Sequence, residues 1–308
     1  MAFASMGANI ITPEGYGPYC FKVHGQVYHA SSPLHPSTPG TEKYAQLYIL
    51  DTEEANQRRM NLQANQGCSA DLMRTISTVI SRVSAYARNY KTMHEIEQEE
   101  IRRAAREGRP PKPYTMVMRH ASNVSSNRYD LPTAKEVAVV FEDYEGEPPV
   151  RRGFQVYSRG STRTRQVSVL DSNLDPMVYP LLFPGCDEGW NPLLPKIGST
   201  KGVTQMEYYA YRIAIRDEFN PILWGGKLFQ QYLVDAYCKA ESNRLNYLRK
   251  IQRELRAESY SGLADYVAHR AEREGMIPGT VVILPSSFTG SARNMRESYL
   301  DAMRVSVF

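Results

Sequence analysis

The stretch from Leu228 to Glu258 constrains the fold most strongly, because its apolar side chains repeat with a helical period. The repeating residues are Leu245, Leu248, Ile251 and Leu255. Spacings of three and four residues place side chains on one face of an α-helix, where they can pack on a core. The pattern predicts a long amphipathic helix in the C-terminal third of the chain.

Basic residues form a second stripe on the same stretch, about 100° round the helix from the apolar one. The stripe consists of Arg249, Arg253 and Arg256, with Lys250 beside it. Guanidinium groups can hold nucleic-acid phosphates in bidentate fashion, so this face is a candidate for contact with DNA or RNA. A solvated helix flank explains the stripe equally well, and both interpretations stay open here.

Composition allows a large folded core without defining a partner. The chain has 308 residues, 42% of them hydrophobic, enough for one large domain or two ordinary ones. A net charge of +4 is compatible with nucleic-acid binding but does not demand it.

The cysteines and the absence of apolar runs indicate an intracellular, soluble protein that does not enter a membrane. The cysteines form no CxxC pair, and scattered cysteines favour free thiols. They are Cys20, Cys68, Cys186 and Cys238. Met1 to Pro13 lacks the features of a signal peptide, and no stretch approaches the roughly 20 apolar residues of a membrane helix.

The first half of the chain predicts short elements of both kinds. Residues 1–18 are expected to be a disordered lead-in, and Tyr19 to Tyr28 a short hairpin or strand pair. Ala45 to Leu50 has the composition of a buried strand. Asp51 then supplies a cap for a helix.

Two helices are predicted between residues 69 and 106. The first begins at Ser69 and carries an apolar face of Leu72, Ile76, Val79, Ile80 and Val83. The second, Thr92 to Arg106, has acids first and bases last, which suits the helix dipole and favours a solvated helix. Gly108 to Pro113 ends it.

The rest of the chain predicts an α+β fold, with short strands in the first half and long helices in the C-terminal third. Residues 114–170 contain three strand-like segments, and residues 171–191 form a loop rich in proline and aromatics. Further expected elements are helices at Met206–Glu218 and Leu228–Glu258, a strand at Thr280–Leu284, and a last helix from near Arg293.

Motifs for catalysis or metal binding are missing, so no catalytic residue and no metal ligand is predicted. Gly198 to Gly202 has the wrong spacing for a phosphate-binding loop, and neither HExxH nor GxSxG occurs. The six histidines never occur as H-x-H. His24, His29 and His35 cluster loosely and are interpreted as satisfied surface or turn residues.

Three tyrosines lie close together at Tyr208, Tyr209 and Tyr211. A tyrosine can attack a DNA phosphate, but that reaction needs a metal to polarise the phosphate, and no site for one is evident. Packing of amphipathic aromatic rings is the preferred interpretation.

Several long stretches resemble, in order, the Helitron helicase-like region. FKVHGQVYH followed by AQLYILDTEEANQRR resembles its opening, and LDPMVYPLLFPGCDEGW resembles its aromatic–proline motif. GGKLFQQYLVDAYCKAESNRLNYLR and ILPSSFTGSARNMRESYLDAM are similar to its most distinctive segments nearly residue for residue. The resemblance runs from about Tyr19 to Met303.

The resemblance implies a rolling-circle transposase, located in the nucleus or elsewhere inside the cell. Such proteins join an HUH endonuclease, which uses strand histidines, Mg²⁺ or Mn²⁺ and helix tyrosines to cut DNA, to an ATP-dependent helicase. The chain ends soon after Asp301-Ala302-Met303, before any position that corresponds to those histidines, tyrosines or ATP-binding motifs. Residues 19–200 are therefore expected to be an N-terminal α+β region, and residues 201–308 to lead into the edge of an incomplete nuclease domain.

The expected role is contact with single-stranded DNA at transposon ends, or scaffolding for nuclease and helicase domains, without catalysis or a cofactor of its own. The candidate DNA-binding residues are Arg249, Lys250, Arg253, Arg256 and Arg293. The alternative is a repurposed, non-catalytic DNA-binding or interaction module derived from such an element.

Overall fold

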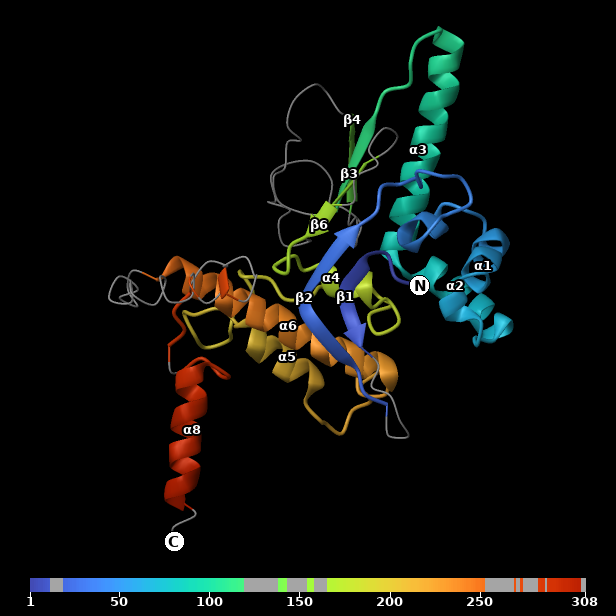
Figure 1. Cartoon of the computed structure of the whole chain (residues 1–308). Coiled ribbons are helices and arrows are strands. Elements are labelled where there is room, and N and C mark those ends of the chain that lie inside the picture. Colours follow the sequence, from blue (N-terminus) through green and yellow to red (C-terminus); the bar gives the residue numbers. More distant parts are fainter. Residues whose placement is uncertain are drawn as a thin grey trace. The chain divides into compact units, whose positions relative to one another are not determined.

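A computed structural model describes residues 1–11, 19–118, 138–142, 154–157, 165–252, 269, 272–273, 282–285 and 287–305 (Figure 1). The chain forms two compact units, Met1–Cys238 and Lys239–Phe308. Helices and short antiparallel strands make it an α+β protein, as the sequence predicts. A domain boundary near residue 200 stays a prediction.

The first unit contains an antiparallel sheet of β1 (Ser5–Ile11), β2 (Lys22–Ser31) and β6 (Arg165–Val167), with β2 in the middle. The expectation of a disordered lead-in is wrong for residues 1–11, and the expected hairpin at residues 19–28 is instead part of β2. The small residues of β1 give no local strand signal, and pairing with β2 orders them. Gly7 lies opposite Tyr28, whose ring occupies the space of a Cβ at that position.

A second antiparallel sheet confirms the three strand-like segments between residues 114 and 170. Its strands are β3 (Tyr114–Met118), β4 (Ala138–Glu142) and β5 (Phe154–Tyr157), in the order β4-β3-β5. The side chain of Met116, on the central strand, is fully buried. β3 comes soon after a long helix, so the polypeptide changes from helix to sheet within a few residues.

The predicted strand at Ala45–Leu50 is wrong, although the predicted burial is right. Residues 45–48 lie in a 3-10 helix, η1 (Tyr44–Tyr48), and all four are buried. Short apolar runs do not distinguish a strand from one buried helical turn. Asp51 caps α1 (Thr52–Met60) as predicted, because its carboxylate accepts hydrogen bonds from the backbone N–H groups of Glu53 and Glu54.

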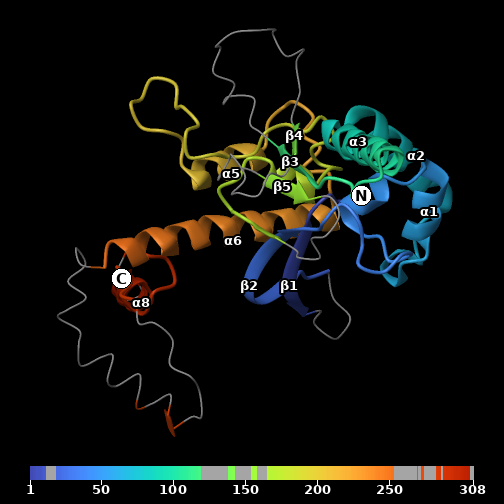
Figure 2. The ribbon, with the colours of Figure 1, turned by 90° about the horizontal axis from the view of Figure 1, so that it is seen from above.

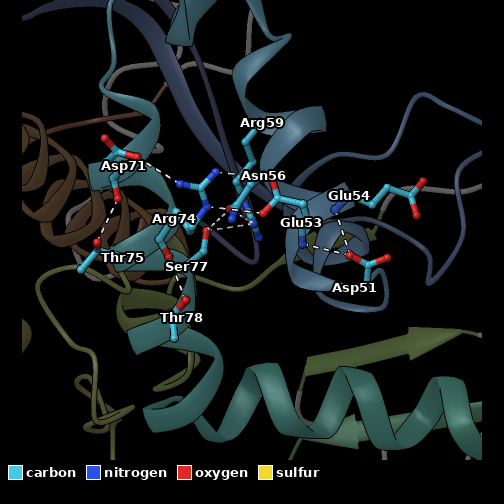
Figure 3. A network of polar contacts seen from close by, with 10 residues as sticks. All are labelled: Asp51, Glu53, Glu54, Asn56, Arg59, Asp71, Arg74, Thr75, Ser77 and Thr78. Carbon is cyan, nitrogen blue, oxygen red and sulfur yellow. Dashed lines mark hydrogen bonds and ion pairs between the residues drawn. The ribbon is translucent and has the colours of Figure 1, made fainter.

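Polar side chains join α1 to α2 (Ala70–Val83), which follows the short η2 (Gln63–Asn65) (Figure 3). The buried guanidinium of Arg59 on α1 donates to Ser77 Oγ on α2 at 3.1 Å and lies 5.0 Å from the centre of the Tyr48 ring. Arg74 pairs with both Glu53 and Asp71 at the surface.

The predicted apolar face of α2 is mostly uncovered. Only Ile80 of its five members is fully buried, and Leu72, Val79 and Val83 are exposed. The helix is therefore held by Ile80 and by the polar contacts of Ser77 and Arg59 more than by a continuous apolar seam.

The helix α3 (Ala85–Glu107) is longer than predicted and is not solvated all round. Tyr86, Tyr90, Met93 and Ala104 lie on its buried side, and so do the carboxylates of Glu97 and Glu100. The order of charges predicts a solvated face for these acids, and that prediction is wrong for Glu97 and Glu100, because charge order along a helix carries no information on packing. Gly108 ends the helix in the left-handed region, at φ 65°, as the sequence predicts.

Aromatic side chains dominate the core of the first unit. Phe3 stacks on Tyr48 at 4.3 Å between ring centres and lies near Tyr86 and Tyr90. Its backbone N–H donates to the carbonyl of Met177, in α4 (Leu174–Val178), at 2.7 Å. The loop predicted at residues 171–191 thus contains a short helix and supplies core contacts.

Further helices in the described part of the chain are α5 (Gln205–Ile213), α6 (Lys227–Lys250) and α8 (Ala292–Val305). α5 ends five residues before its predicted end, and α6 is one uninterrupted helix (Figure 2). The predicted strand at Thr280–Leu284 is wrong for residues 282–284, which have no regular secondary structure. All four cysteines are free, and no helix among the described residues is long and apolar enough to cross a membrane.

Candidate nucleic-acid interface

The C-terminal half of α6 places apolar and basic side chains on different faces. Leu248 is buried in the second unit, and Leu245 and Ile251 are half-buried. Arg249 and Lys250 are exposed in the last turn of the helix. Arg249 donates to the amide oxygen of Asn246 at 2.9 Å, which orients the guanidinium along the helix surface. Three other members of the predicted stripes, Arg253, Leu255 and Arg256, lie outside the described residues.

The amide side chain of Gln252 explains why residues 282–284 do not form a strand. Its nitrogen donates to the carbonyl of Ile283 at 3.1 Å, and its oxygen accepts from the N–H of Ile283 at 2.7 Å. A side-chain amide therefore makes both hydrogen bonds that a neighbouring strand would make. This pair holds the segment before α8 against the end of α6 within the second unit.

A tight turn at residues 287–290 precedes α8. Phe288 is buried in this turn, and the guanidinium of Arg244 lies 4.9 Å from the centre of its ring. Ser291 caps the helix, because its hydroxyl accepts from the N–H of Asn294 at 3.1 Å. The N–H of Gly290, at φ 84°, donates to the side chain of Asn294 at 3.2 Å.

The helix α8 exposes both basic and apolar side chains. Arg293 and Arg296 are exposed near its start, and no acidic residue lies in its first turn. Backbone N–H groups at a helix start carry partial positive charge, so this end of α8 favours an anion. Met295, Tyr299 and Met303, spaced four residues apart, are each about half exposed or more.

Charge is distributed unevenly along the chain. Residues 239–308 hold 11 lysines and arginines against 8 aspartates and glutamates, a net of +3 out of the +4 of the whole chain. The first 238 residues, with 26 basic against 25 acidic residues, are nearly neutral. Among the residues that the structure describes, neither Arg249 nor Lys250 forms an ion pair.

The tyrosines at residues 208–211 divide between core and surface. Tyr208 and Tyr209 are buried, as the packing interpretation predicts, whereas Tyr211 is exposed. Burial raises the pKa of Tyr208, and the nearby Arg212, whose guanidinium donates to its hydroxyl at 3.0 Å, opposes that rise. Tyr209 donates to Asp175 at 3.3 Å. These contacts give both residues a role in packing.

Sequence reasoning missed a buried polar network around Asp235 on α6. Its carboxylate lies 2.9 Å from Nε2 of His29 on β2 and accepts a hydrogen bond from the Tyr179 hydroxyl at 3.0 Å. His29 is buried, so its interpretation as a surface or turn residue is wrong. No local pattern links residues 206 positions apart, although a histidine within an alternating segment was a visible hint.

A second group that the sequence did not predict joins His35, in the loop after β2, to His94 and Glu97 on α3. Nε2 of His35 is hydrogen-bonded to Glu97, and Nδ1 of His94 lies 4.0 Å from the same carboxylate oxygen. The pKa of His94 is lowered by burial first and by the neighbouring His35 second. The spacing of His94 and Glu97, three residues apart on a predicted helix, was the one signal available.

The comparison with known protein families gives a similarity for the C-terminal third of the chain. Residues 208–307 match the family model described as Helitron helicase-like domain at N-terminus. The predicted resemblance is thereby confirmed over these residues, which include α6 and α8. The earlier motifs, from FKVHGQVYH to LDPMVYPLLFPGCDEGW, precede the matched range. No curated protein and no solved structure matches the chain.

Proposed function

We propose that this chain is the N-terminal region of a Helitron-type rolling-circle transposase, and that it contacts DNA without cutting it. The observation that carries the proposal is the exposed pair Arg249 and Lys250 at the end of α6, inside the range that matches the Helitron helicase-like domain. The pair stands in the part of the chain that holds most of the net positive charge.

Contact with phosphate applies to the basic residues at the end of α6 and at the start of α8, whereas the structural explanation applies only at the end of α6. Basic residues in the last turn of α6 also suit the negative end of the helix dipole, which is the structural explanation for Arg249 and Lys250. That explanation does not extend to α8, where Arg293 lies in the first turn beside the positive end of the dipole. A DNA phosphate bound at the start of α8 would be stabilised by the backbone N–H groups of the first turn and by the charge of Arg293.

The absence of catalysis is the second half of the proposal. The sequence contains no H-x-H pair and no GK[ST] loop, and Tyr208 and Tyr209 are engaged in core packing. We expect the purified chain, incubated with single-stranded DNA and Mg²⁺ or Mn²⁺, to form no covalent protein–DNA product. A tyrosine–DNA adduct on a denaturing gel would contradict this expectation.

The DNA contact is tested with Arg249→Gln/Lys250→Gln. Loss of two phosphate contacts should weaken binding to single-stranded DNA roughly five- to twentyfold near 0.1 M salt. It should also reduce the slope of log K against log salt by about 1.4. Fluorescence anisotropy of a labelled oligonucleotide at several salt concentrations measures both quantities. Adding Arg253→Gln and Arg256→Gln extends the test along the predicted basic stripe.

The control is Arg102→Gln/Arg106→Gln, which removes two exposed charges, both paired with Glu99, from α3 in the first unit. This variant should retain its affinity and its salt slope, because the proposed contact lies on α6 and α8. Equal losses in the two double variants would mean that DNA responds to net charge alone. Unchanged binding in the folded Arg249→Gln/Lys250→Gln variant would remove the basis of the proposal.

A further inference from the structure

Three side chains of metal-binding type meet in the first unit, away from the residues proposed to contact DNA. His94 and Glu97 lie one helical turn apart on α3, and His35 reaches them from the loop after β2. One ligand atom from each residue lies within 4.8 Å of the others. Residues from two segments, 62 positions apart for His35 and Glu97, thus converge on one point.

The spacing of these atoms is close to that of a metal centre. Nitrogen and oxygen ligands lie about 2.0–2.2 Å from Zn²⁺, which puts two ligands of a tetrahedral ion roughly 3.4 Å apart. Nδ1 of His94 is 4.0 Å from the Glu97 carboxylate, and His35 is already in contact with it. The three ligand atoms therefore lie at separations comparable to those around one ion.

The group also has unused bonding capacity that points to a ligand. Glu97 is almost fully buried, with 5% of its side chain exposed. Among the described residues, neither the second carboxylate oxygen of Glu97 nor Nδ1 of His94 has a hydrogen-bond partner. Buried polar atoms are normally paired, so two unpartnered atoms in one group of ligand-type side chains indicate room for a further partner. The two imidazoles are partly exposed, which leaves a path for entry.

We propose that His35, His94 and Glu97 bind a divalent transition-metal ion, with Zn²⁺ as the preferred ion and one coordination position left to water. Two imidazoles and one carboxylate form a borderline-soft set that suits Zn²⁺. Mg²⁺ requires oxygen ligands in octahedral geometry and does not fit it. The bound ion links the loop after β2 to α3. The single negative charge of Glu97 offsets half of the charge of the divalent ion.

The binding test uses the full chain carrying Cys20→Ser and Cys68→Ser, which removes the exposed thiols that compete for zinc. Titration against a chromophoric zinc chelator should show one equivalent bound with a dissociation constant in the micromolar range or below. Loading with Co²⁺ should give the visible absorption bands of a four-coordinate ion. Thermal unfolding should shift upward with Zn²⁺ and not with excess Mg²⁺, because an ion that binds the native state stabilises it.

Substitution of the ligands decides whether the ion sits at this place. His94→Gln and Glu97→Gln should each weaken zinc binding at least tenfold and remove the cobalt bands. Glu95→Gln changes an exposed carboxylate on the same helix and should leave both readouts unchanged. Circular dichroism verifies folding, and His35→Gln, in a loop, provides a third variant whose effect does not depend on the integrity of α3.

Two results would overturn the proposal. One is the absence of a one-to-one zinc complex tighter than about 0.1 mM. The other is equal zinc affinity in the parent chain and in folded His35→Gln, His94→Gln and Glu97→Gln variants. Neither result bears on DNA binding, which is measured on different residues in the second unit.

Discussion

The two halves of α6 belong to different units and differ in the kind of side chain that they bury or expose. In the first unit, Tyr232, Asp235 and Ala236 are buried, and the Asp235 carboxylate is hydrogen-bonded inside the protein. In the second unit, the same helix exposes Tyr247, Arg249 and Lys250. Both halves have a buried and an exposed face, since Tyr237 is exposed in the first half and Leu248 is buried in the second. The side chains that each unit packs against the helix decide which face is buried.

Among the described residues, buried carboxylates distinguish the first unit from the second, although Lys239 of the second unit is buried as well. The first unit encloses the carboxylates of Glu97, Glu100 and Asp235, each in contact with a basic or histidine side chain. Enclosed charges must be paired, because an unpaired one costs several kcal/mol. The exposed cations described in the second unit are under no such requirement. Replacement of Arg249 and Lys250 should therefore affect binding more than stability.

The largest effect is expected from removal of the Asp235 carboxylate. Asp235→Ala leaves His29 and the Tyr179 hydroxyl buried without their acceptor, and should lower the free energy of unfolding by about 3 kcal/mol. Urea denaturation followed by circular dichroism measures this loss. Asp235→Asn, which keeps one acceptor oxygen, should recover part of the stability.

The control for this prediction is Asp217→Ala, since Asp217 is an exposed residue of the same unit. Its effect should stay within about 0.5 kcal/mol, as is usual for surface substitutions. Equal free energies of unfolding for the Asp235 and Asp217 variants would mean that burial of the Asp235 carboxylate does not contribute to stability.

A smaller effect, with a defined pH dependence, is expected at Glu100. Hydrogen bonds from Arg109 first, then from the N–H of Lys112 and from Arg103, lower the pKa of its carboxyl to about 2. The unfolded chain binds this proton near pH 4.3, so the stabilisation is complete above that pH and is lost as the pH falls towards 2. The partly exposed arginines are screened by solvent, which keeps the effect below that of Asp235.

Glu100→Gln removes this dependence, so its stability should fall less steeply than that of the parent between pH 4.3 and 2. Urea unfolding at several pH values provides the comparison. Glu99→Gln, at an exposed neighbouring position, should reproduce the parental acid profile. A parental profile in Glu100→Gln would mean that the carboxylate contributes nothing to acid stability.

The smallest effect concerns the start of α8. Ser291→Ala removes the capping hydroxyl and should cost about 1 kcal/mol of local stability. That amount corresponds to about fivefold faster amide exchange at Asn294 and Met295 if exchange proceeds through local opening. Ser298→Ala, at an exposed position inside the helix, should not accelerate exchange, because alanine favours helix more than serine does. Unchanged exchange in Ser291→Ala would show that the cap does not hold α8.

Features encoded within a few residues could be read from the sequence. Asp51 indicates the start of α1, and Gly108 indicates the end of α3. The apolar period of residues 245–251 predicts α6. Caps and periods are local because backbone hydrogen bonds in a helix join residues four positions apart. The α+β class follows from adding up such local signals. The Helitron resemblance depends on longer motifs, of which residues 208–307 are confirmed.

Tertiary structure alone decided which residues meet. Pairing with β2 turned residues 5–11 into a strand, and packing made a 3-10 helix of residues 44–48, although neither segment carries a decisive local signal. The same holds for the meeting of His35 with His94 and Glu97, and of His29 with Asp235. Contacts between distant residues depend on how whole elements pack, and no periodicity of a single segment contains that information.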